Sequence, residues 1–217
     1  MNLIIGVLGR PKKANQDITI ISKSLTDVIV KYNNIPLGIV APVIDVNNEM
    51  NEGDIAKLHK VLSLCSGIIL QGGLAYYQYD LEAIKYIYEN NIPLLGICLG
   101  MQSIGVAFGA ALDIVDNHKY VGIPYVHDVV IDKHSKLYQI VETNHIRVNS
   151  RHNEMIIKPQ NIKVVGYSDG VIEAIEKENR PFFLGVQWHP EDMIEYDEAS
   201  RKIFEHFFLA CEKHSKQ

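Results

Sequence analysis

Two short segments of this chain carry side chains that together could perform nucleophilic catalysis. Cys98 lies in one of them, between an apolar run and Gly100, and His189 lies in the other, two residues before Glu191. A thiol becomes a strong nucleophile when a neighbouring base takes its proton, and a carboxylate can orient that base. The sequence therefore predicts a cysteine hydrolase in which Cys98 attacks, His189 is the base and Glu191 orients His189.

The surroundings of Cys98 have the form of a nucleophile elbow, with cysteine in place of serine. Gly96 and Gly100 flank Cys98, an apolar strand-like run precedes it and a helix-like run follows it. Such an elbow requires glycines because its turn is tight, and the helix dipole favours a thiolate at that position. The alternative is that Cys98 is a buried core cysteine, which is the usual fate of a free thiol.

His189 and Glu191 are two residues apart and follow an apolar strand-like run. In an extended segment, residues at this spacing face the same side, so the Glu191 carboxylate could accept a hydrogen bond from the His189 ring and fix its tautomer. A surface turn containing histidine, proline and glutamate remains the alternative for this segment.

Backbone amides could complete the site. Gly72 and Gly73 end a predicted strand, so the amide of Gly73 could point at a developing oxyanion, with the amide of Leu99 as the second donor. A glycine pair that merely turns the chain is the alternative. Gln102 lies one turn into the predicted helix, where it could contact a substrate or cap a packing face.

A second polar segment could line a specificity pocket. It contains Asn149, Ser150, Arg151 and His152, directly after a strand-like run. Arg151 could bind a substrate carboxylate. A solvated loop arginine is the alternative for this residue.

Composition excludes several classes of protein. The 217 residues carry a net charge of −5 with 47% hydrophobic residues, so there is no basic excess for nucleic acid. The histidines lack metal-ligand spacing, so no metal site is expected.

Three cysteines form an odd set typical of a reducing compartment, and we interpret Cys65 and Cys211 as core residues. The apolar N-terminus is a poor signal peptide and too short to span a membrane, which favours a cytoplasmic protein.

Apolar strand-like runs alternate with helix-like runs in the first half of the chain. This order predicts βαβ units and a parallel sheet covered on both faces, with sites at the carboxyl ends of the strands. Predicted strands span residues 3–8, 36–43, 67–70 and 93–97, and predicted helices span residues 18–30, 52–65, 81–89 and 102–108.

The second half is predicted to be more antiparallel. Residues 168–170 are a hairpin-turn signal between two strand-like runs, and an amphipathic helix over residues 198–211 closes the chain. No linker or internal repeat divides the sequence, so residues 1–217 are expected to form one domain. The strand-like runs span residues 128–131, 146–149, 162–167, 170–177 and 182–188.

At these motifs the chain resembles the class I glutamine amidotransferase-like superfamily. The segment from Gly96 to Gln102 is similar to its nucleophile motif, and the segment from Gly185 to Glu191 is similar to its His-Pro-Glu motif. Within the superfamily, residues 148–152 and 168–174 resemble the γ-glutamyl-γ-aminobutyrate hydrolase family, which is peptidase C26-like.

The resemblance implies an α/β fold, a flavodoxin-like three-layer sandwich whose central sheet is mostly parallel, with some antiparallel strands in the C-terminal half. It also implies hydrolysis of a small-molecule γ-glutamyl amide through a γ-glutamyl thioester on Cys98. No metal or organic cofactor is implied, and no nucleic acid or membrane partner is expected. A homodimer is left open.

The chain departs from the family pattern on the leaving-group side of the pocket. Leu74 and Ala75 replace the usual Asp and Pro, Asn153 and Glu154 replace His and Gln, and Leu99 stands where Arg is frequent. These changes leave the amine of the substrate open. Two alternatives therefore remain. One is a glutaminase subunit that passes ammonia to a separate synthetase. The other is a non-catalytic binding protein on the same fold, and the intact Cys98, His189 and Glu191 argue against it.

Overall fold

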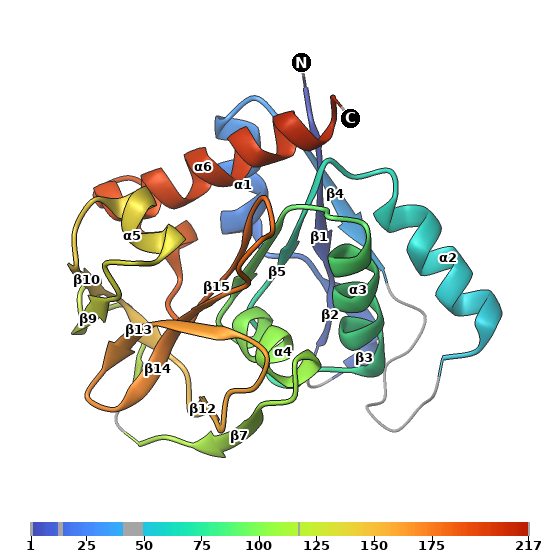
Figure 1. Ribbon diagram of the computed structural model, residues 1–217. Coiled ribbons are helices and arrows are strands. Elements are labelled where there is room, and N and C mark those ends of the chain that lie inside the picture. The colour runs from blue at the N-terminus through green and yellow to red at the C-terminus, as the bar shows by residue number, and fades with distance from the viewer. Residues whose placement is uncertain (1, 13–14, 41–49, 117, 217) are drawn as a thin grey trace.

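The computed structural model describes residues 2–12, 15–40, 50–116 and 118–216. Its centre is a nine-stranded sheet in the order β10-β9-β13-β14-β15-β6-β5-β1-β4 (Figure 1). The strands from β4 to β15 are parallel, and those from β14 to β10 are antiparallel. The nine strands are β1 (Ile4–Leu8), β4 (Ile35–Ile39), β5 (Gly67–Leu70), β6 (Leu94–Ile97), β9 (His127–Ile131), β10 (His145–Val148), β13 (Lys163–Ser168), β14 (Val171–Glu176) and β15 (Phe183–Val186).

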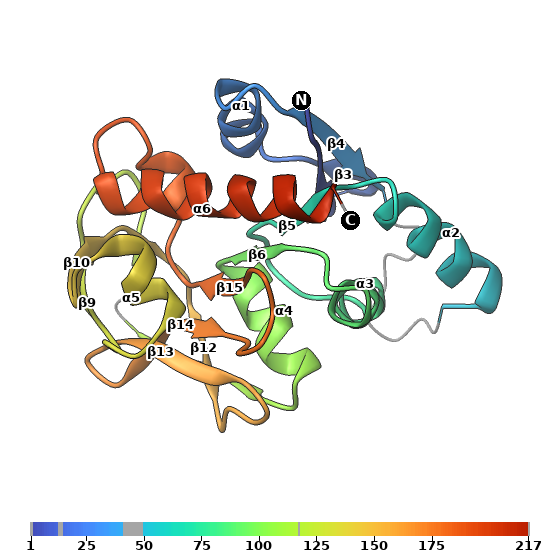
Figure 2. The same cartoon turned by 45° about the horizontal axis from the view of Figure 1, so that its top comes forward.

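Helices cover both faces of this sheet, which gives three layers (Figures 1 and 2). One apolar cluster joins the sheet to α1, α5 and α6, and a second joins its other face to α2, α3 and α4. The predicted three-layer α/β sandwich is therefore confirmed. The helices are α1 (Lys23–Lys31), α2 (Glu52–Leu62), α3 (Gln78–Glu89), α4 (Leu99–Ala107), α5 (Lys136–Val141) and α6 (Glu198–His214).

The inner parallel strands β5, β6 and β15 are apolar throughout because each is buried on both faces, whereas the edge strand β4 is partly exposed. Along β5, Ile69 packs in the cluster with α6, whereas Ile68 and Leu70 pack in the cluster with α3 and α4. Successive side chains of a strand point to opposite faces, so a continuous apolar run supplies two cores at once. Cys65 and Cys211 are buried in these clusters, as the sequence predicts.

The helix predicted over residues 18–30 is wrong at its start. Residues up to Ile20 form β3 (Asn15–Ile20), which pairs with β2 (Arg10–Lys12) as a two-stranded sheet, and α1 begins at Lys23. Ile18 and Ile20 are exposed. The spacing of Ile18 with Ile21 and Leu25 fitted a helical face, but pairing with β2 overrides that pattern. Of the predicted strand over residues 36–43, β4 ends at Ile39, and residues 41–43 lie outside the described part.

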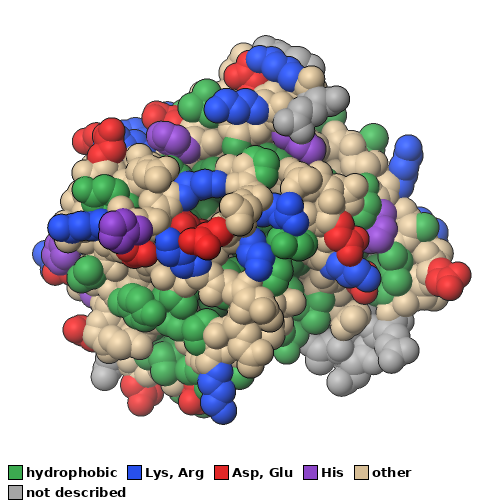
Figure 3. All heavy atoms as spheres, in the orientation of Figure 1, with side chains coloured by type: hydrophobic (Ala, Val, Ile, Leu, Met, Phe, Trp, Pro, Cys, Tyr) green, Lys and Arg blue, Asp and Glu red, His purple; other side chains and the backbone are tan. Residues whose placement is uncertain are grey.

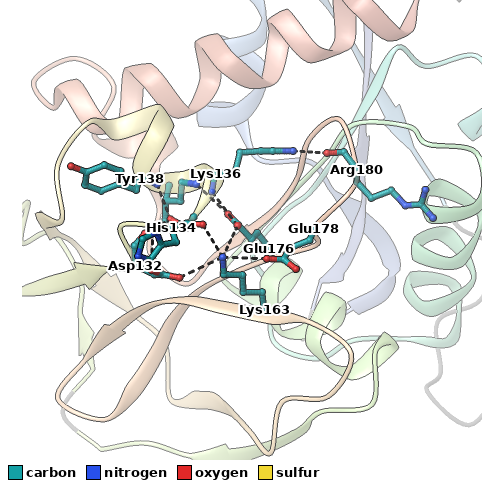
Figure 4. A network of polar contacts seen from close by, with 10 residues as sticks. Asp132, His134, Lys136, Tyr138, Lys163, Glu176, Glu178 and Arg180 are labelled. Carbon is teal, nitrogen blue, oxygen red and sulfur yellow. Dashed lines mark hydrogen bonds and ion pairs between the residues drawn. The ribbon is translucent and has the colours of Figure 1, made fainter.

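Helix α5 is absent from the predicted elements because tertiary contacts hold its first turn. Ser135 Oγ accepts a hydrogen bond from the Tyr138 amide at 2.9 Å, and the Glu176 carboxylate accepts from the amides of Lys136 at 3.1 Å and Leu137 at 3.2 Å. Figure 4 shows this network, in which the Lys163 ammonium also approaches Glu176. Glu176 comes from β14, so no local signal could reveal this cap.

Two further two-stranded pairs were not predicted. β7 (Ala111–Ile114) pairs with β12 (Glu154–Ile157), and β8 (Lys119–Tyr120) pairs with β11 (Ser150–Arg151). A 3-10 turn, η1 (Pro190–Asp192), follows β15. Each pair joins segments far apart in the sequence, and together they place the 150–157 region beside α4.

No helix in the described ranges has the length and apolar character needed to cross a bilayer. On the face shown in Figure 3, acidic and basic side chains are interspersed rather than gathered by sign. This distribution agrees with the absence of a basic excess in the sequence.

Helix α4 approaches the sheet unusually closely at its first turn. A Cβ atom at Gly100 would lie 2.0 Å from the backbone oxygen of Leu70, and one at Gly96 would lie 2.8 Å from the backbone of Gly100. Gly185 on β15 gives the same helix room, since a Cβ there would lie 2.8 Å from Met101 Cγ. Three glycines therefore allow the helix that carries the elbow to sit against β5, β6 and β15.

We predict that Gly100→Ala destabilises the protein by more than about 2 kcal/mol, because the new methyl group meets backbone that cannot rotate away. Urea unfolding measures the change. Gly53→Ala is the matched control, since Gly53 is exposed in α2 and alanine there should be neutral or stabilising by about 0.5–1 kcal/mol. Equal stability of the Gly100→Ala variant and the parent would contradict the close approach.

Candidate active site

Cys98 forms the link between β6 and α4 in a strained conformation. Its φ and ψ are 53° and −108°, a region that non-glycine residues rarely adopt and that costs about 1–3 kcal/mol. Its amide donates a hydrogen bond to the Val186 carbonyl at 2.8 Å, which holds the turn against β15. The predicted nucleophile elbow is present in its geometry, and the thiol lies at the N-terminus of α4.

His189 and Glu191 form a hydrogen-bonded pair after β15. His189 Nδ1 lies 2.8 Å from Glu191 Oε1, and both side chains are largely buried. Because the carboxylate can only accept, Nδ1 carries the proton and Nε2 is left facing away from Glu191. The expected contact between His189 and Glu191 is therefore present, although Glu191 lies in a 3-10 turn over residues 190–192 rather than in the extended segment that the prediction assumed.

The thiol and the imidazole meet beside the glycine pair. The Cys98 and His189 side chains both lie against Gly72. A Cβ atom built at Gly72 would lie 2.9 Å from His189 Cε1 and 3.6 Å from Cys98 Cβ. Gly72 therefore leaves the space that His189 and Cys98 fill, so this glycine does more than turn the chain.

The electrostatics of His189 favour its charged form. Burial alone lowers the pKa of His189, but the Glu191 carboxylate and the Cys98 side chain together outweigh it and raise the pKa from 6.5 to about 10. The direction follows from placing a cation between two groups that are negative when ionised. His189 is therefore held in its protonated form near neutral pH.

Two backbone amides lie next to the thiol. Leu99 is the first residue of α4, so its N–H has no acceptor within the helix. Gly73 is close to it, since a Cβ at Gly73 would lie 2.8 Å from Leu99 Cδ2. Gly73 and Leu99 therefore lie side by side at the start of α4.

A buried polar group supports the glycine pair, and the sequence-based prediction missed it. Arg10 forms an ion pair with Asp80 and donates to the Gln71 carbonyl at 3.3 Å. The Gln71 side chain donates to the carbonyls of Leu8 at 3.0 Å and Ile20 at 2.8 Å. The only local signal was an arginine directly after the first strand. Its partner is seventy residues away.

Asn149 holds the backbone of His189 from both sides. Its Oδ1 accepts from the His189 amide at 2.8 Å, and its Nδ2 donates to the His189 carbonyl at 2.9 Å. Gln102 is buried and donates to the Glu154 carbonyl at 2.9 Å and to Gln187 Oε1 at 3.2 Å. The side-chain amides of Asn149 and Gln102 were predicted to contact substrate. In the structure, these hydrogen bonds hold neighbouring protein groups in place.

Ser150, Arg151 and His152 are also engaged with protein atoms. Ser150 Oγ donates to the His118 carbonyl at 2.5 Å, and His152 Nδ1 lies 3.0 Å from the Glu154 carbonyl. Arg151 forms an ion pair with Asp192 at the surface. Arg151 thus lies beside the His189 turn, although its charge is already partnered.

A cavity of about 700 Å³ opens beside the glycine pair. Gly72 and Gly73 form part of its wall, and Arg10 and Lys12 contribute cationic side chains. Its position at the carboxyl ends of the parallel strands is where α/β sheets usually bind ligands. Tyr77 also lines the cavity, whereas Tyr79 is buried and donates its hydroxyl to the Gly9 carbonyl at 3.0 Å.

The chain is similar to known proteins over most of its length. The model of the glutamine amidotransferase class-I family matches residues 11–211. The γ-glutamyl-γ-aminobutyrate hydrolase PuuD of Escherichia coli is 31% identical over 153 residues, which cover 62% of this chain and 60% of that protein. The chain thus spans less than two thirds of that relative. A CTP synthase of Nautilia profundicola is 28% identical over 67% of this chain and 35% of that protein.

Solved structures share the fold. A GMP synthase subunit from Thermoplasma acidophilum superposes with a TM-score of 0.74 at 20% identity, over 100% of this chain and 97% of that one. With the elbow, the histidine–glutamate pair and a family match that extends from β2 to α6, this chain belongs to the glutamine amidotransferase class-I family.

Proposed function

We propose that this protein is a cysteine-dependent hydrolase of γ-glutamyl amides, with γ-glutamyl-γ-aminobutyrate or a related γ-glutamyl amine as substrate. The observation that carries the proposal is the convergence of Cys98, His189 and Glu191 where parallel strands β6 and β15 end. The hydrolase relative supports the choice of substrate class.

The chemistry runs in two halves. His189 Nε2 holds the proton taken from the Cys98 thiol as Sγ attacks the γ-carbonyl carbon, and it gives that proton to the leaving amine as the C–N bond breaks. The product is a γ-glutamyl thioester. A water molecule then attacks the thioester carbonyl while His189 takes a proton from that water. The C–S bond breaks and releases glutamate and the Cys98 thiolate.

Fixed dipoles and charges lower the barrier to both halves. The amides of Gly73 and Leu99 donate to the oxyanion that develops on the carbonyl oxygen. Glu191 keeps the proton on His189 Nδ1, so that Nε2 is the atom that exchanges protons with substrate. Lys12, which is exposed and lines the adjoining cavity, favours the carboxylate of the γ-glutamyl group.

A second function is favoured by the synthase relative. The matched part of the Nautilia profundicola CTP synthase is 35% of that protein. This share fits a glutaminase region joined to a separate synthetase region. Leu99 also replaces the arginine frequent in the hydrolases. In this alternative the same residues hydrolyse glutamine and deliver ammonia to a separate synthetase, and the chain alone is nearly inactive.

Glutamate release by the purified chain separates the two functions. We expect turnover of γ-glutamyl amines, including γ-glutamyl-γ-aminobutyrate, to exceed that of glutamine, because the cavity of about 700 Å³ beside the glycine pair has room for a leaving group larger than ammonia. Cys98→Ala should lower kcat by at least about 1,000-fold while substrate still binds, since it removes only the nucleophile.

The control for Cys98→Ala is Cys65→Ala, which removes a buried thiol in the core away from the site. It should keep its turnover once it is folded. A Cys98→Ala protein that still hydrolysed γ-glutamyl amides would exclude the mechanism, and activity that appears only with a synthetase would favour the alternative.

The raised pKa of His189 predicts a pH dependence. The leaving amine needs protonated His189, so kcat/KM should hold until the pH approaches about 10 and fall above it. Glu191→Gln keeps a hydrogen-bond acceptor but removes the charge that raises this pKa, so the alkaline limb should move to lower pH. Measuring kcat/KM from mildly acidic to strongly alkaline pH locates this alkaline limb. The limb belongs to the Cys98–His189 pair as a unit rather than to either residue alone.

An unchanged alkaline limb in Glu191→Gln would remove Glu191 from its proposed role. Glu195→Gln is the control for a charge outside the site. Glu195 is exposed and pairs with Lys31, so its removal should leave the limb in place.

A further inference from the structure

A second group of polar side chains lies outside the thiol site. It consists of His118, His127, His152 and Glu173, which we call the three-histidine cluster. One potential ligand atom from each lies within 4.8 Å of the others. The Nε2 atoms of His127 and His152 are 3.6 Å and 3.5 Å from Glu173 Oε1. The sequence spacing gave no sign of it because the four residues come from separate segments.

The cluster contains buried polar atoms that lack partners. The Glu173 side chain is fully buried, and neither of its oxygens has a hydrogen-bond partner among the described residues, whereas Glu176 on the same strand caps α5. His152 Nε2 and both ring nitrogens of His127 also lack partners within the described ranges. A buried carboxylate without hydrogen bonds is costly unless a cation balances it. The arrangement is therefore incomplete without a positively charged occupant.

The histidine tautomers indicate what that occupant is. His118 Nδ1 lies 3.0 Å from the Asp116 carbonyl, and His152 Nδ1 lies 3.0 Å from the Glu154 carbonyl. A carbonyl can only accept, so Nδ1 carries the proton and each neutral ring directs the Nε2 lone pair elsewhere. Metal-binding histidines are held in this way, with the second nitrogen donating to a backbone carbonyl.

His127 is the third imidazole of the cluster. Its Nε2 atom lies 3.6 Å from Glu173 Oε1 and has no hydrogen-bond partner among the described residues. A neutral imidazole offers a lone pair to a metal ion, whereas a protonated ring offers none. Lone pairs from three histidines and one carboxylate thus converge on one point.

We propose that the three-histidine cluster binds one divalent transition-metal ion, with Zn²⁺ as the best fit. Three imidazole nitrogens and one carboxylate oxygen are a familiar tetrahedral zinc set. Bonds of about 2.0–2.1 Å place tetrahedral ligand atoms about 3.3 Å apart. The two histidine–glutamate distances are already close to this value, and only small movements of the other ligands are needed.

Access to the cluster comes from the surface. A cavity of about 400 Å³ is lined by His118, His127 and Tyr125, so an ion can reach the cluster without unfolding of the sheet. Four protein ligands close the coordination sphere, which is typical of a structural rather than a catalytic zinc site.

The ion would support the thiol site indirectly. The His118 carbonyl accepts hydrogen bonds from Ser150 Oγ and from the His152 amide at 3.1 Å. Ser150 follows Asn149, which holds the His189 backbone. Metal binding therefore ties the segment around His118 and β11 to β9 and β14, and stiffens the side of the site that positions His189.

Zinc titration of chelator-treated protein tests the proposal. The full chain carrying Cys98→Ala is used, so that the thiol cannot act as a ligand, and isothermal titration gives stoichiometry and affinity. We expect one Zn²⁺ per chain and a rise in Tm of about 5–10 °C at a hundredfold excess over Kd. Co²⁺ in place of Zn²⁺ should give the intense visible absorption of a tetrahedral site.

Single variants assign the ion to the cluster. His118→Gln and His127→Gln, made in the Cys98→Ala chain, should each weaken Zn²⁺ binding by at least about 100-fold, more than a lost supporting hydrogen bond costs. His134→Gln, at an exposed histidine, should bind Zn²⁺ like its parent. Both ligand variants are at half-buried positions, and their Tm without metal verifies that they fold.

Two results would overturn the proposal. One is the absence of stoichiometric Zn²⁺ binding in the parent, which would leave protonated histidines as the balance for Glu173. The other is equal Zn²⁺ affinity in His118→Gln and its parent, which would place the ion elsewhere, for example at His189, Glu191 and Asp192. Neither result bears on hydrolysis, which depends on Cys98.

Discussion

The close packing of the first turn of α4 against the sheet is the constraint on which the site depends. The Leu70 carbonyl lies where a side chain at Gly100 would begin, and Gly96 and Gly185 remove further obstacles beneath the same helix. This contact fixes where the helix starts and forces Cys98 into its positive-φ conformation. The strain is sustained because the buried strands on either side cannot relax without loss of packing.

Support for the site arrives from both halves of the chain. On the N-terminal side, the buried Arg10–Asp80 ion pair and Gln71 hold the loop that contains the glycine pair. Breaking such a pair by removing one partner typically costs about 3–5 kcal/mol, because a charge is left buried. On the C-terminal side, Asn149 holds the backbone of His189. The reacting atoms thus lie between two rigid polar frameworks.

Local patterns in the sequence were enough to predict the parallel βαβ half, the buried strands and the elbow. These patterns are apolar runs of strand length, glycines around Cys98, and the two-residue spacing of His189 and Glu191. The match to the glutamine amidotransferase class-I family agrees with this prediction. The β2–β3 hairpin was missed because the apolar residues of β3 were assigned to the following helix, and α5 was missed because its Glu176 cap is a non-local contact.

The roles of the supporting polar residues, by contrast, became visible only in three dimensions. Asn149, Gln102 and His152 looked like substrate ligands because they are polar and close to the motifs, but their hydrogen bonds go to protein backbone or to a buried glutamine. The Arg10–Asp80 ion pair could not be predicted from the sequence, because its two residues are seventy positions apart and no sequence pattern links them. The three-histidine cluster was hidden for the same reason: ligand spacing in sequence is informative only when the ligands share an element, and these come from separate segments that the sheet brings together.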